Sequence, residues 1–395
     1  MAFSTGPVAA WLSQKVLQAM KTKCDRELFL KAFQTAAMVV PARTSHEILS
    51  NLKLEVSSSG VELIGTDLEV GIRLAVPGFE IETPGTVVLP VDRTIQILRE
   101  CSDETLRLEN DGQRTWVRGQ WSEFQLPSED PAQYPAVQGF LEGPHHEIGS
   151  KQMKLLVRRT AFATDTQDNR YALGGVLMEF DSDRITAIGT DGRRMAVQPA
   201  EATGVDGHGQ NDSRPIVPVR ALNLLQRALE DSDEPVKITA RENDIIFSFG
   251  QTTIYSRLLE GRFPVWGDIL AGLPGGVRLD LPVGPLASVV RQSMIVTDQK
   301  DRSVEFQFGD GQLVLTAIGA ERGESRVEMP IDFDGGPLTV KLFPPFLLDF
   351  LKLFEPDQVF QLVMSDPKRP LVAQTEDGYR YVMMPLAKES RQAPA

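Results

Sequence analysis

The sequence predicts an α+β protein made of three tandem copies of one domain, each with two helices packed on antiparallel sheets. Three observations lead to this prediction: the chain length, a phrase that recurs along the chain, and hairpin signals in every copy. A chain of 395 residues is too long for one ordinary hydrophobic core, so two to four domains are expected. The composition, with 42% apolar and 24% charged residues, is that of a globular protein.

A recurring phrase marks the three copies. The stretch ELIGTDLEVGIRLAV begins at Glu62, ITAIGTDGRRMAVQP begins at Ile185, and both carry I-G-T-D after apolar residues. A weaker third version, LVLTAIGAERGESRV, has Gly319 where the first two have Gly65 and Gly189. A period of roughly 125 residues indicates tandem domains rather than a solenoid. The expected division, in chain order, is an N-terminal extension (1–24), three domains (25–145, 146–272 and 273–387) and a C-terminal tail (388–395).

Each copy contains two predicted helices. Apolar residues at helical spacing predict a first helix ahead of the glycine phrase, around Leu28–Met38, Met153–Phe162 and Leu286–Met294. After each phrase a β-rich run passes through proline into a second helix, in TVVLPVDRTIQILRE, RPIVPVRALNLLQRALE and LTVKLFPPFLLDFLKLFE.

Strand pairs are predicted around Asn, Asp and Gly turns. The stretches are RLENDGQRTWVRG, VKITARENDIIFSFG and VEFQFGDGQLVLTAI, one in each copy. Repeated antiparallel domains leave sheet edges that must be paired or blocked. Joining these edges across domains, and then across subunits, solves the problem and leads to a ring.

The chain is acidic, with a formal net charge of −13, which by itself argues against a nucleic-acid partner. That argument fails if the basic residues gather on one surface. The predicted helix SKQMKLLVRRTAF has basic residues and no acidic one, and Lys151, Lys154 and Arg158 share a face. Basic pairs recur in the other predicted helices: Arg220 and Arg227, Arg93 and Arg99, Arg291 and Lys352. A solvated helix face is the alternative, but recurrence favours a common anionic partner, and the lack of interleaved aromatic residues favours phosphate contact.

The sequence also indicates the cellular compartment in which the protein is expected. No stretch approaches the roughly 18 consecutive apolar residues that a membrane helix needs. The N-terminus lacks the basic and apolar pattern of a secretory signal. Two cysteines, Cys24 and Cys101, are too few for a disulfide framework. A cytoplasmic protein without a membrane partner is expected.

Signals for catalysis are weak, and no catalytic residue, metal or cofactor is predicted. The phosphate-loop pattern and the G-x-S-x-G nucleophile elbow do not occur. The adjacent His145 and His146 are assigned to a surface linker, since no cluster at metal-ligand spacing accompanies them. Asp67 and Asp191 recur in the repeat and are assigned to a structural turn. Two alternatives stay open: a repeat-built, metal-dependent nuclease or hydrolase that uses these carboxylates, and a protein scaffold that does not bind DNA.

Four phrases in order resemble one family: DNRYALGGVLMEF, AIGTDGRRMAV, EGRFPVWGDIL and the terminal YVMMPL. The chain resembles the β subunit of bacterial DNA polymerase III, the sliding clamp, over residues 25–387. The resemblance implies three DNA-clamp domains that form half of a ring, closed by a second copy head to tail around duplex DNA. It implies a non-catalytic protein that tethers the replicative polymerase, is opened and closed by a clamp-loading ATPase, and serves other replication or repair proteins with clamp-binding motifs.

The same resemblance implies site residues. Positions matching family DNA contacts are Arg43, Gln167 and Tyr171, beside the basic helix residues above. Partner proteins insert a short apolar motif into a pocket between the second and third domains, whose matching positions are Leu173, Thr190, Gly192, Arg193, Arg194, Met195, Pro264, Ile269, Phe346, Met384, Pro385 and Leu386. The subunit interface maps onto Phe124 and Leu126 on one side and Ile295 and Val296 on the other.

Overall fold

The computed structural model describes residues 20–165, 172–209, 214–232, 234–271, 275–298, 302–319, 322–333 and 335–386. They form two compact units. The first runs to Gln138 and includes Gln251–Thr253, and the second comprises Gly139–Gly250 and the chain from Ile254 on. The first unit holds the first copy of the repeat, and the second unit holds the other two.

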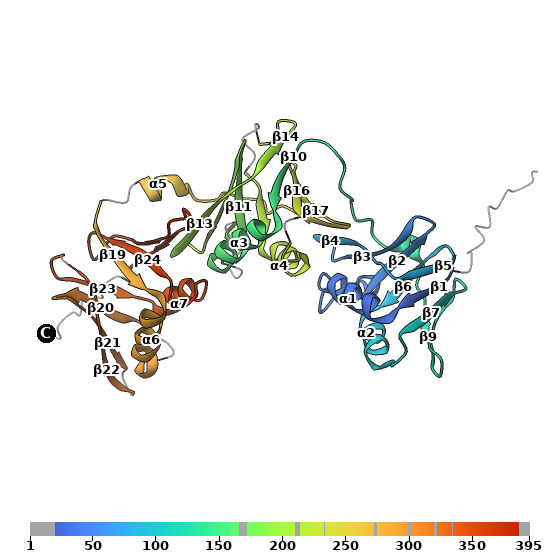
Figure 1. Ribbon diagram of the computed structural model, residues 1–395, viewed down its shortest axis with the longest axis horizontal. Coiled ribbons are helices and arrows are strands. Elements are labelled where there is room, and N and C mark those ends of the chain that lie inside the picture. Colours follow the sequence, from blue (N-terminus) through green and yellow to red (C-terminus); the bar gives the residue numbers. More distant parts are fainter. Residues whose placement is uncertain are drawn as a thin grey trace, which may run out of the picture. The chain divides into compact units, whose positions relative to one another are not determined.

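The first unit contains two α-helices and two sets of antiparallel strands (Figure 1). One sheet has the order β5-β1-β7-β8-β9, and a second set has the order β4-β3-β2-β6. In chain order the elements are β1 (Met20–Asp25), α1 (Arg26–Ala37), the 3₁₀ turn η1 (Glu47–Ser50), β2 (Asn51–Ser57), β3 (Gly60–Thr66), β4 (Val70–Ala75), β5 (Phe79–Thr83), β6 (Gly85–Pro90), α2 (Val91–Glu100), β7 (Thr105–Asn110), β8 (Arg114–Arg118), β9 (Glu123–Pro127) and η2 (Pro131–Gln133).

Local sequence explains these elements. The carboxylate of Asp25 caps α1 by accepting from the Leu28 backbone N–H at 2.9 Å. Pro90 directly precedes α2, as the sequence predicts. Asn110 and Thr115 face each other across the first predicted hairpin, β7–β8. Strand β1 pairs with both β5 and β7, although only its last residue falls inside the first expected domain.

The second unit begins with the second copy of the repeat. Its strands β14-β10-β16-β17-β18 follow one another in one sheet, and β15-β11-β12-β13 lie in another. The elements are β10 (His145–Gly149), α3 (Ser150–Thr160), η3 (Ala161–Ala163), η4 (Ala172–Gly174), β11 (Gly175–Asp181), β12 (Arg184–Thr190), β13 (Arg194–Glu201), β14 (Thr203–Val205), β15 (Ile216–Pro218), α4 (Val219–Ala228), β16 (Pro235–Ala240), β17 (Asp244–Phe249) and β18 (Thr252–Arg257).

The third copy completes the second unit. A four-stranded sheet has the order β22-β21-β20-β23, and strands β26-β25-β24-β19 form a second layer. The elements are α5 (Trp266–Ala271), β19 (Val277–Pro282), α6 (Val283–Ser293), η5 (Met294–Val296), β20 (Val304–Gly309), β21 (Gln312–Gly319), β22 (Gly323–Pro330), β23 (Leu338–Leu342), α7 (Pro344–Leu351), β24 (Val359–Met364), β25 (Leu371–Gln374) and β26 (Arg380–Met383). The short helix α5 is an element that the sequence did not predict.

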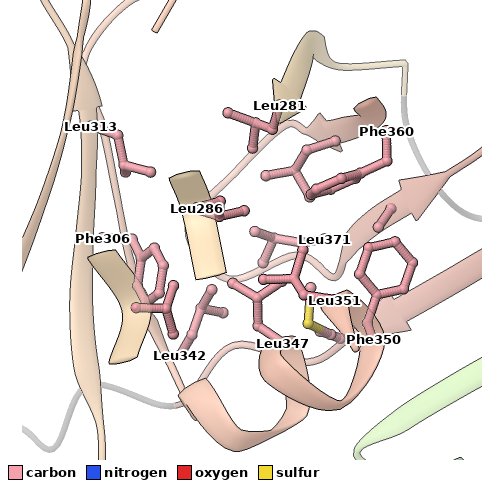
Figure 2. Packing of buried hydrophobic residues seen from close by; sticks show 14 of the residues in the cluster. Leu281, Leu286, Phe306, Leu313, Leu342, Leu347, Phe350, Leu351, Phe360 and Leu371 are labelled. Atoms are coloured by element: carbon pink, nitrogen blue, oxygen red, sulfur yellow. The ribbon is translucent and has the colours of Figure 1, made fainter. Parts of the chain in front are cut away.

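The core of the third copy lies between its helices and its two sheets. Figure 2 shows Leu286 of α6, Leu347 and Phe350 of α7, Phe306 of β20 and Leu371 of β25 pointing into one apolar cluster. Phe350 is stacked on Tyr379 and Tyr381, with ring centroids 5.9 and 5.2 Å apart. Helix–sheet packing of this kind confirms the predicted α+β class.

One sheet joins the second copy to the third. Strand β13 pairs with β26, so that Met195 faces Val382 and Ala196 faces Tyr381. The resulting eight-stranded sheet, β15-β11-β12-β13-β26-β25-β24-β19, is continuous across both copies. The expectation that sheet edges are joined across domains is confirmed within this unit, and β13 and β26 each gain a backbone partner.

The glycine of the recurring phrase allows a strand to touch the end of a helix. A Cβ on Gly189 would lie 2.2 Å from the carbonyl oxygen of Thr160, the last residue of α3. A Cβ on Gly319 would lie 2.0 Å from the carbonyl oxygen of Val296, at the end of η5. No side chain fits at these separations. In the first copy a Cβ on Gly65 would lie 2.7 Å from the Leu52 and Val39 side chains, so the phrase recurs because the glycine of each copy lies too close to its neighbours for a side chain.

The Thr-Asp pair of the phrase shapes a turn. In the first copy, the Thr66 hydroxyl donates to the Val70 carbonyl at 2.9 Å, and the Asp67 carboxylate accepts from the Val70 N–H at 2.7 Å. Leu68 between them has a φ of 80°. This is the bonding pattern of an Asx turn, and it supports the structural assignment of Asp67.

The assignment of His145 and His146 to a surface linker is wrong. Both side chains are buried in strand β10. The backbone N–H of Ala240 donates to His208 Nε2 at 3.0 Å, so the Nδ1 of neutral His208 carries the proton and donates to His146 Nδ1 at 2.6 Å. His146 Nε2 then donates to the Asp181 carbonyl at 2.6 Å.

This histidine chain needs both rings neutral. Burial lowers the pKa of His208 to about 4 and also lowers the pKa of His146. The pair thus serves as a hydrogen-bonded part of the core. Histidine is a polar residue, so the sequence alone suggests an exposed position for His146. Its burial is possible because His208 and the Asp181 carbonyl satisfy both of its ring nitrogens.

Among the described residues, no helix has both the length and the apolar character needed to cross a membrane.

Candidate functional site

Arg194 lies at the centre of the junction between the second and third copies. Its guanidinium donates to Asp191 Oδ2 at 2.9 Å, to Asp349 Oδ2 of α7 at 2.8 Å and to the Phe162 carbonyl at 2.8 Å. It also lies over the ring of Phe346, 4.4 Å from the centroid. Since this side chain is only 10% exposed, the ion pairs are well shielded from water. Arg194 therefore links two copies of the repeat through charge, backbone and aromatic contacts.

The turn before Arg194 presents the neighbouring predicted residues. The Thr190 hydroxyl donates to the Arg194 carbonyl at 2.6 Å and accepts from the Gly192 N–H at 3.1 Å. Asp191 Oδ1 accepts from the N–H groups of Arg193 and Arg194, both at 2.9 Å. Gly192 has a φ of 83°, a left-handed conformation that glycine adopts without strain. The turn holds Arg193 outward and Arg194 inward.

The last described segment of the chain lies against this turn. The Met384 N–H donates to the Arg193 carbonyl at 2.9 Å, and the Leu386 N–H donates to the Lys341 carbonyl at 2.8 Å. Met384 is 44% exposed although it is apolar. Burial raises the pKa of the Tyr381 hydroxyl, which therefore stays protonated and donates to the Phe346 carbonyl at 2.9 Å. These backbone contacts fix Met384, Pro385 and Leu386 beside Arg193 and Phe346.

An apolar cluster continues from the turn across the joined sheet. Met195, Ile188 and Val382 are buried in it, and Phe263, Trp266 and Leu270 pack against it from the α5 region. Trp266 Nε1 donates to Glu179 Oε1 at 3.0 Å, which fixes this segment. The remaining predicted positions divide by exposure: Leu173 and Thr190 are buried, whereas Pro264 and Ile269 are exposed.

The exposed basic face predicted on α3 is present in part. Lys151 and Arg158 are exposed, and Met153, Leu156 and Val157 are buried on the other side. Lys154 is half-buried and donates to Asp231 Oδ1 at 2.7 Å, and this hydrogen bond holds the pKa of the Asp231 carboxyl below its usual range.

Arg159, a further basic residue of α3, belongs to the core. Its Nη1 contacts Gln198 Oε1 at 2.7 Å and Asp377, and its guanidinium lies over the rings of Phe354 and Tyr379. Helix α3 thus presents fewer cationic groups to solvent than its sequence suggests.

The other predicted DNA-binding residues lie on exposed positions of both units. Arg43 follows α1, Arg93 lies on α2, and Arg220 lies on α4, which packs beside α3 (Figure 1). Gln167 and Tyr171 lie outside the described residues.

Strands β9 and β22 are two of the sheet-end strands that have a partner on one side only among the described residues. Strand β9 is the last strand of its five-stranded sheet, and β22 is the last of its four-stranded sheet. Phe124 on β9 is 36% exposed and Ile295 beside β22 is 73% exposed, whereas Leu126 is buried and Val296 is half-buried against the core. The four predicted interface residues therefore lie at open edges, two of them with side chains available in the single chain.

Comparison with known proteins gives these surfaces a context. Models of the DNA polymerase III beta subunit match the chain in three consecutive stretches: the N-terminal domain at residues 20–138, the central domain at 147–265 and the C-terminal domain at 278–387. A beta sliding clamp of Pseudomonas putida is 31% identical over 373 residues, which cover 92% of this chain and 98% of the relative.

The chain belongs to the beta sliding clamp family. Solved sliding clamps share its fold. A Pseudomonas aeruginosa clamp bound to griselimycin has a TM-score of 0.86 at 27% identity and covers 93% of this chain and 100% of that chain. A Bacillus subtilis clamp has a TM-score of 0.86 at 22% identity, with 93% and 99% covered.

Membership in the sliding clamp family makes the chain a DNA processivity clamp, a non-catalytic accessory factor of DNA polymerase III. Neither a nuclease nor a scaffold without DNA binding is supported. The carboxylates considered for such a nuclease are occupied in turns: Asp191 binds Arg194 and two backbone N–H groups, and Asp67 accepts from Val70. Among the described residues, no group of three His, Cys, Asp or Glu side chains is placed to hold a metal ion.

Several residues that build the candidate site were missed from sequence. Asp349 and Phe162 hold Arg194, and Phe263 and Trp266 extend the apolar cluster. Asp349 lies 155 positions from Arg194, and no sequence pattern relates the two. A signal did exist for Trp266, since it belongs to EGRFPVWGDIL, one of the phrases typical of the family.

Proposed function

We propose that two copies of this chain close head to tail into a ring around duplex DNA, in the cytoplasm. The ring tethers the catalytic subunit of the replicative polymerase to its template and is opened by the clamp-loading ATPase. The observation that carries this proposal is the exposed cationic side of α3 in a chain of net charge −13. Phosphate contact without base contact holds DNA but lets it slide, because phosphates repeat regularly and carry no sequence information.

The proposed DNA-contacting residues are Lys151, Arg158 and Arg220 in the second unit and Arg43 and Arg93 in the first. Lys154 also contacts DNA once its ammonium group leaves Asp231 and binds a phosphate. Breaking this ion pair costs little free energy because Asp231 is exposed. The proposed domains are 25–145, 146–272 and 273–387, a division supported by the three stretches that the family models match.

The proposed site for partner proteins is the surface formed by the 190–195 turn, α5, Phe346 and the segment Met384–Leu386. Exposed Met384 and half-buried Leu386 can accept apolar side chains of varied shape. Ile269 and Pro264 add exposed apolar area, and Arg193 adds a positive charge at its margin. Such a surface fits the short apolar motif of the polymerase or of another DNA-processing protein.

The proposed ring contact joins edge strand β9 of one copy to edge strand β22 of the other. Each strand ends its own sheet and therefore has backbone groups available for pairing. Exposed Phe124 and Ile295 flank the two edges and supply apolar contact, whereas Leu126 and Val296 support the edges from the core. Each chain carries one edge of each kind, so the proposed contact is head to tail, and two copies close the ring when the contact turns one copy by half a turn relative to the other.

Charge reversal on α3 tests the DNA contact. In Lys151→Glu with Arg158→Glu, duplex affinity is expected to fall, and the slope of log K against log salt is expected to become shallower by about 2, since each phosphate contact contributes about 0.9. Fluorescence anisotropy with a duplex oligonucleotide at several salt concentrations measures both quantities.

The matched control is Lys368→Glu with Arg369→Glu, which makes the same change in net charge on an exposed turn of the third copy. If the control and the α3 variant lose equal affinity, the effect is one of overall charge and α3 is not the DNA-contacting surface.

A further inference from the structure

Trp121 is the most exposed large apolar side chain in the described part of the chain. It lies in the turn between β8 and β9 and is 90% exposed, whereas Trp116 and Trp266 are half-buried. Tryptophan buries more apolar area than any other residue when it finds a partner, and it is enriched among residues that dominate binding energy. An almost fully solvent-exposed tryptophan on an ordered turn therefore indicates an interaction surface.

The turn that carries Trp121 is fixed on both sides. The Gly119 N–H donates to the Ser122 carbonyl at 2.9 Å, which closes the turn, and the Gln120 N–H donates to Asp103 Oδ1 at 2.9 Å. Arg118, at the end of β8, pairs with Glu109 and Glu123. The backbone is thereby held in place, and the tryptophan projects from it.

Among the residues that the structure describes, the groove beside Trp121 offers the indole no apolar site. The groove beside it, about 790 Å³ in volume, is lined mainly by charged and polar groups, among them Lys23, Asp103, Arg107 and Arg118. Folding the indole into this groove would displace ion pairs and bury little apolar surface. Its exposure is therefore a property of the described part of the folded chain, and it leaves the indole available to another molecule.

The position of Trp121 identifies that partner. The residue lies two positions before Glu123, where the open edge strand β9 begins, and Phe124 on the same strand is exposed as well. A strand that pairs with β9 from outside passes directly beside the turn. The open edge strand β22 of the second unit carries the half-buried Val327, and exposed Ile295 and Ile318 lie next to it.

We propose that Trp121 anchors the closure of the ring by packing against the β22 edge of a second copy. This inference rests on the proposed head-to-tail ring and adds a specific residue to it. The backbone pairing of β9 with β22 supplies direction and register, and the indole supplies most of the apolar contact at the β8–β9 end of the interface.

The test is the dimer dissociation constant of the full chain, measured by sedimentation equilibrium for the wild type and three variants. Trp121→Ala is expected to raise the constant about 30-fold or more, as loss of a central aromatic anchor does. Trp121→Phe, which keeps an aromatic ring, is expected to remain within about threefold of the wild type. Leu141→Ala removes another exposed apolar side chain, 75% exposed and outside strands β9 and β22, and is expected to leave the constant unchanged.

A second readout follows the indole itself. Trp121 contacts little of its own chain, so at a protein concentration below the dimer transition Trp121→Ala is expected to keep the unfolding midpoint of the wild type. The fluorescence of Trp121 is obtained by subtracting the emission of Trp121→Phe from that of the wild type. Its quenching by acrylamide is expected to fall as the protein concentration rises through the dimer transition, because the second copy then covers the indole.

The outcomes separate this inference from the proposed ring. A wild-type chain that stays monomeric at micromolar concentrations contradicts the ring and the anchor together. If the wild type dimerises, but Trp121→Ala does not change the dissociation constant and the quenching of Trp121 does not change on dimerisation, the proposed ring stands and the role of Trp121 in it is contradicted. An unchanged dimer with weakened DNA or peptide binding in Trp121→Ala also overturns it, by assigning the indole to another partner.

Discussion

Replacing Arg194 by methionine is expected to destabilise the second unit by about 2 kcal/mol, because the shielded Asp191 carboxylate loses its cation and the Asp349 carboxylate keeps only Lys352. Asp191 and Asp349 both lose the guanidinium, and the Phe162 carbonyl loses a donor. Methionine keeps the apolar stem but loses the guanidinium over Phe346, so that the loss reflects charge, hydrogen bonds and this cation–π contact rather than volume. Urea unfolding followed by tryptophan fluorescence, which includes Trp266 in the same unit, measures the change.

Arg193→Met is the matched control, since the two arginines are adjacent in one turn and only Arg193 is exposed. Its expected effect is within about 0.5 kcal/mol, as for most surface substitutions. Equal losses in the two variants would show that the turn, and not the Arg194 network, holds the second and third copies together.

Removal of the apolar side chains of Met384 and Leu386 is expected to weaken the binding of a polymerase-derived clamp-binding peptide by about 2 kcal/mol or more, roughly 30-fold in the dissociation constant. Both residues keep their places in Met384→Ala with Leu386→Ala, because their backbone N–H groups bind Arg193 and Lys341. Titration of a fluorescein-labelled peptide with the full chain gives the constant.

Val359→Ala serves as the control for the peptide measurement. Val359 is 58% exposed on β24, in the same copy of the repeat, and is not part of the proposed partner site. A titration curve that the double variant leaves unchanged would exclude the segment Met384–Leu386 from the site, and equal weakening by Val359→Ala would point to a general effect on the third copy.

Features set by neighbouring residues could be predicted from sequence. The hairpins β7–β8, β16–β17 and β20–β21 form at Asn, Asp and Gly turns that restrict the backbone locally. Proline stands at the start of α2, α4 and α7 because the first turn of a helix needs no donor from it. The recurring glycine predicted the repeat, although its reason, contact with a helix end, needed coordinates.

Features that depend on distant partners could not be predicted. His146 is buried because His208 and the Asp181 carbonyl complete its hydrogen bonds, and Ala240 in turn binds His208; none of these is a neighbour of His146 in sequence. In sequence Arg159 cannot be told from the exposed basic residues of α3. It is buried because it pairs with Asp377, which lies 218 positions away.

The candidate site shows the same division. The turn residues Thr190, Asp191 and Gly192 follow from local chemistry, whereas the contact of Arg194 with Asp349 arises only when β13 meets β26. Trp121 is apolar in sequence like any core residue, and its exposure depends on the charged groove that surrounds it.

The most direct test of the account is topological. The chain is loaded by its clamp-loading ATPase onto a nicked circular plasmid, the complex is isolated by gel filtration at salt high enough to suppress simple phosphate contact, and half of it is cut once with a restriction enzyme. A ring that encloses DNA stays on the circle and is lost from the cut plasmid, because it slides over the free ends. Equal retention on circular and linear DNA, or equal loss from both, would contradict encirclement.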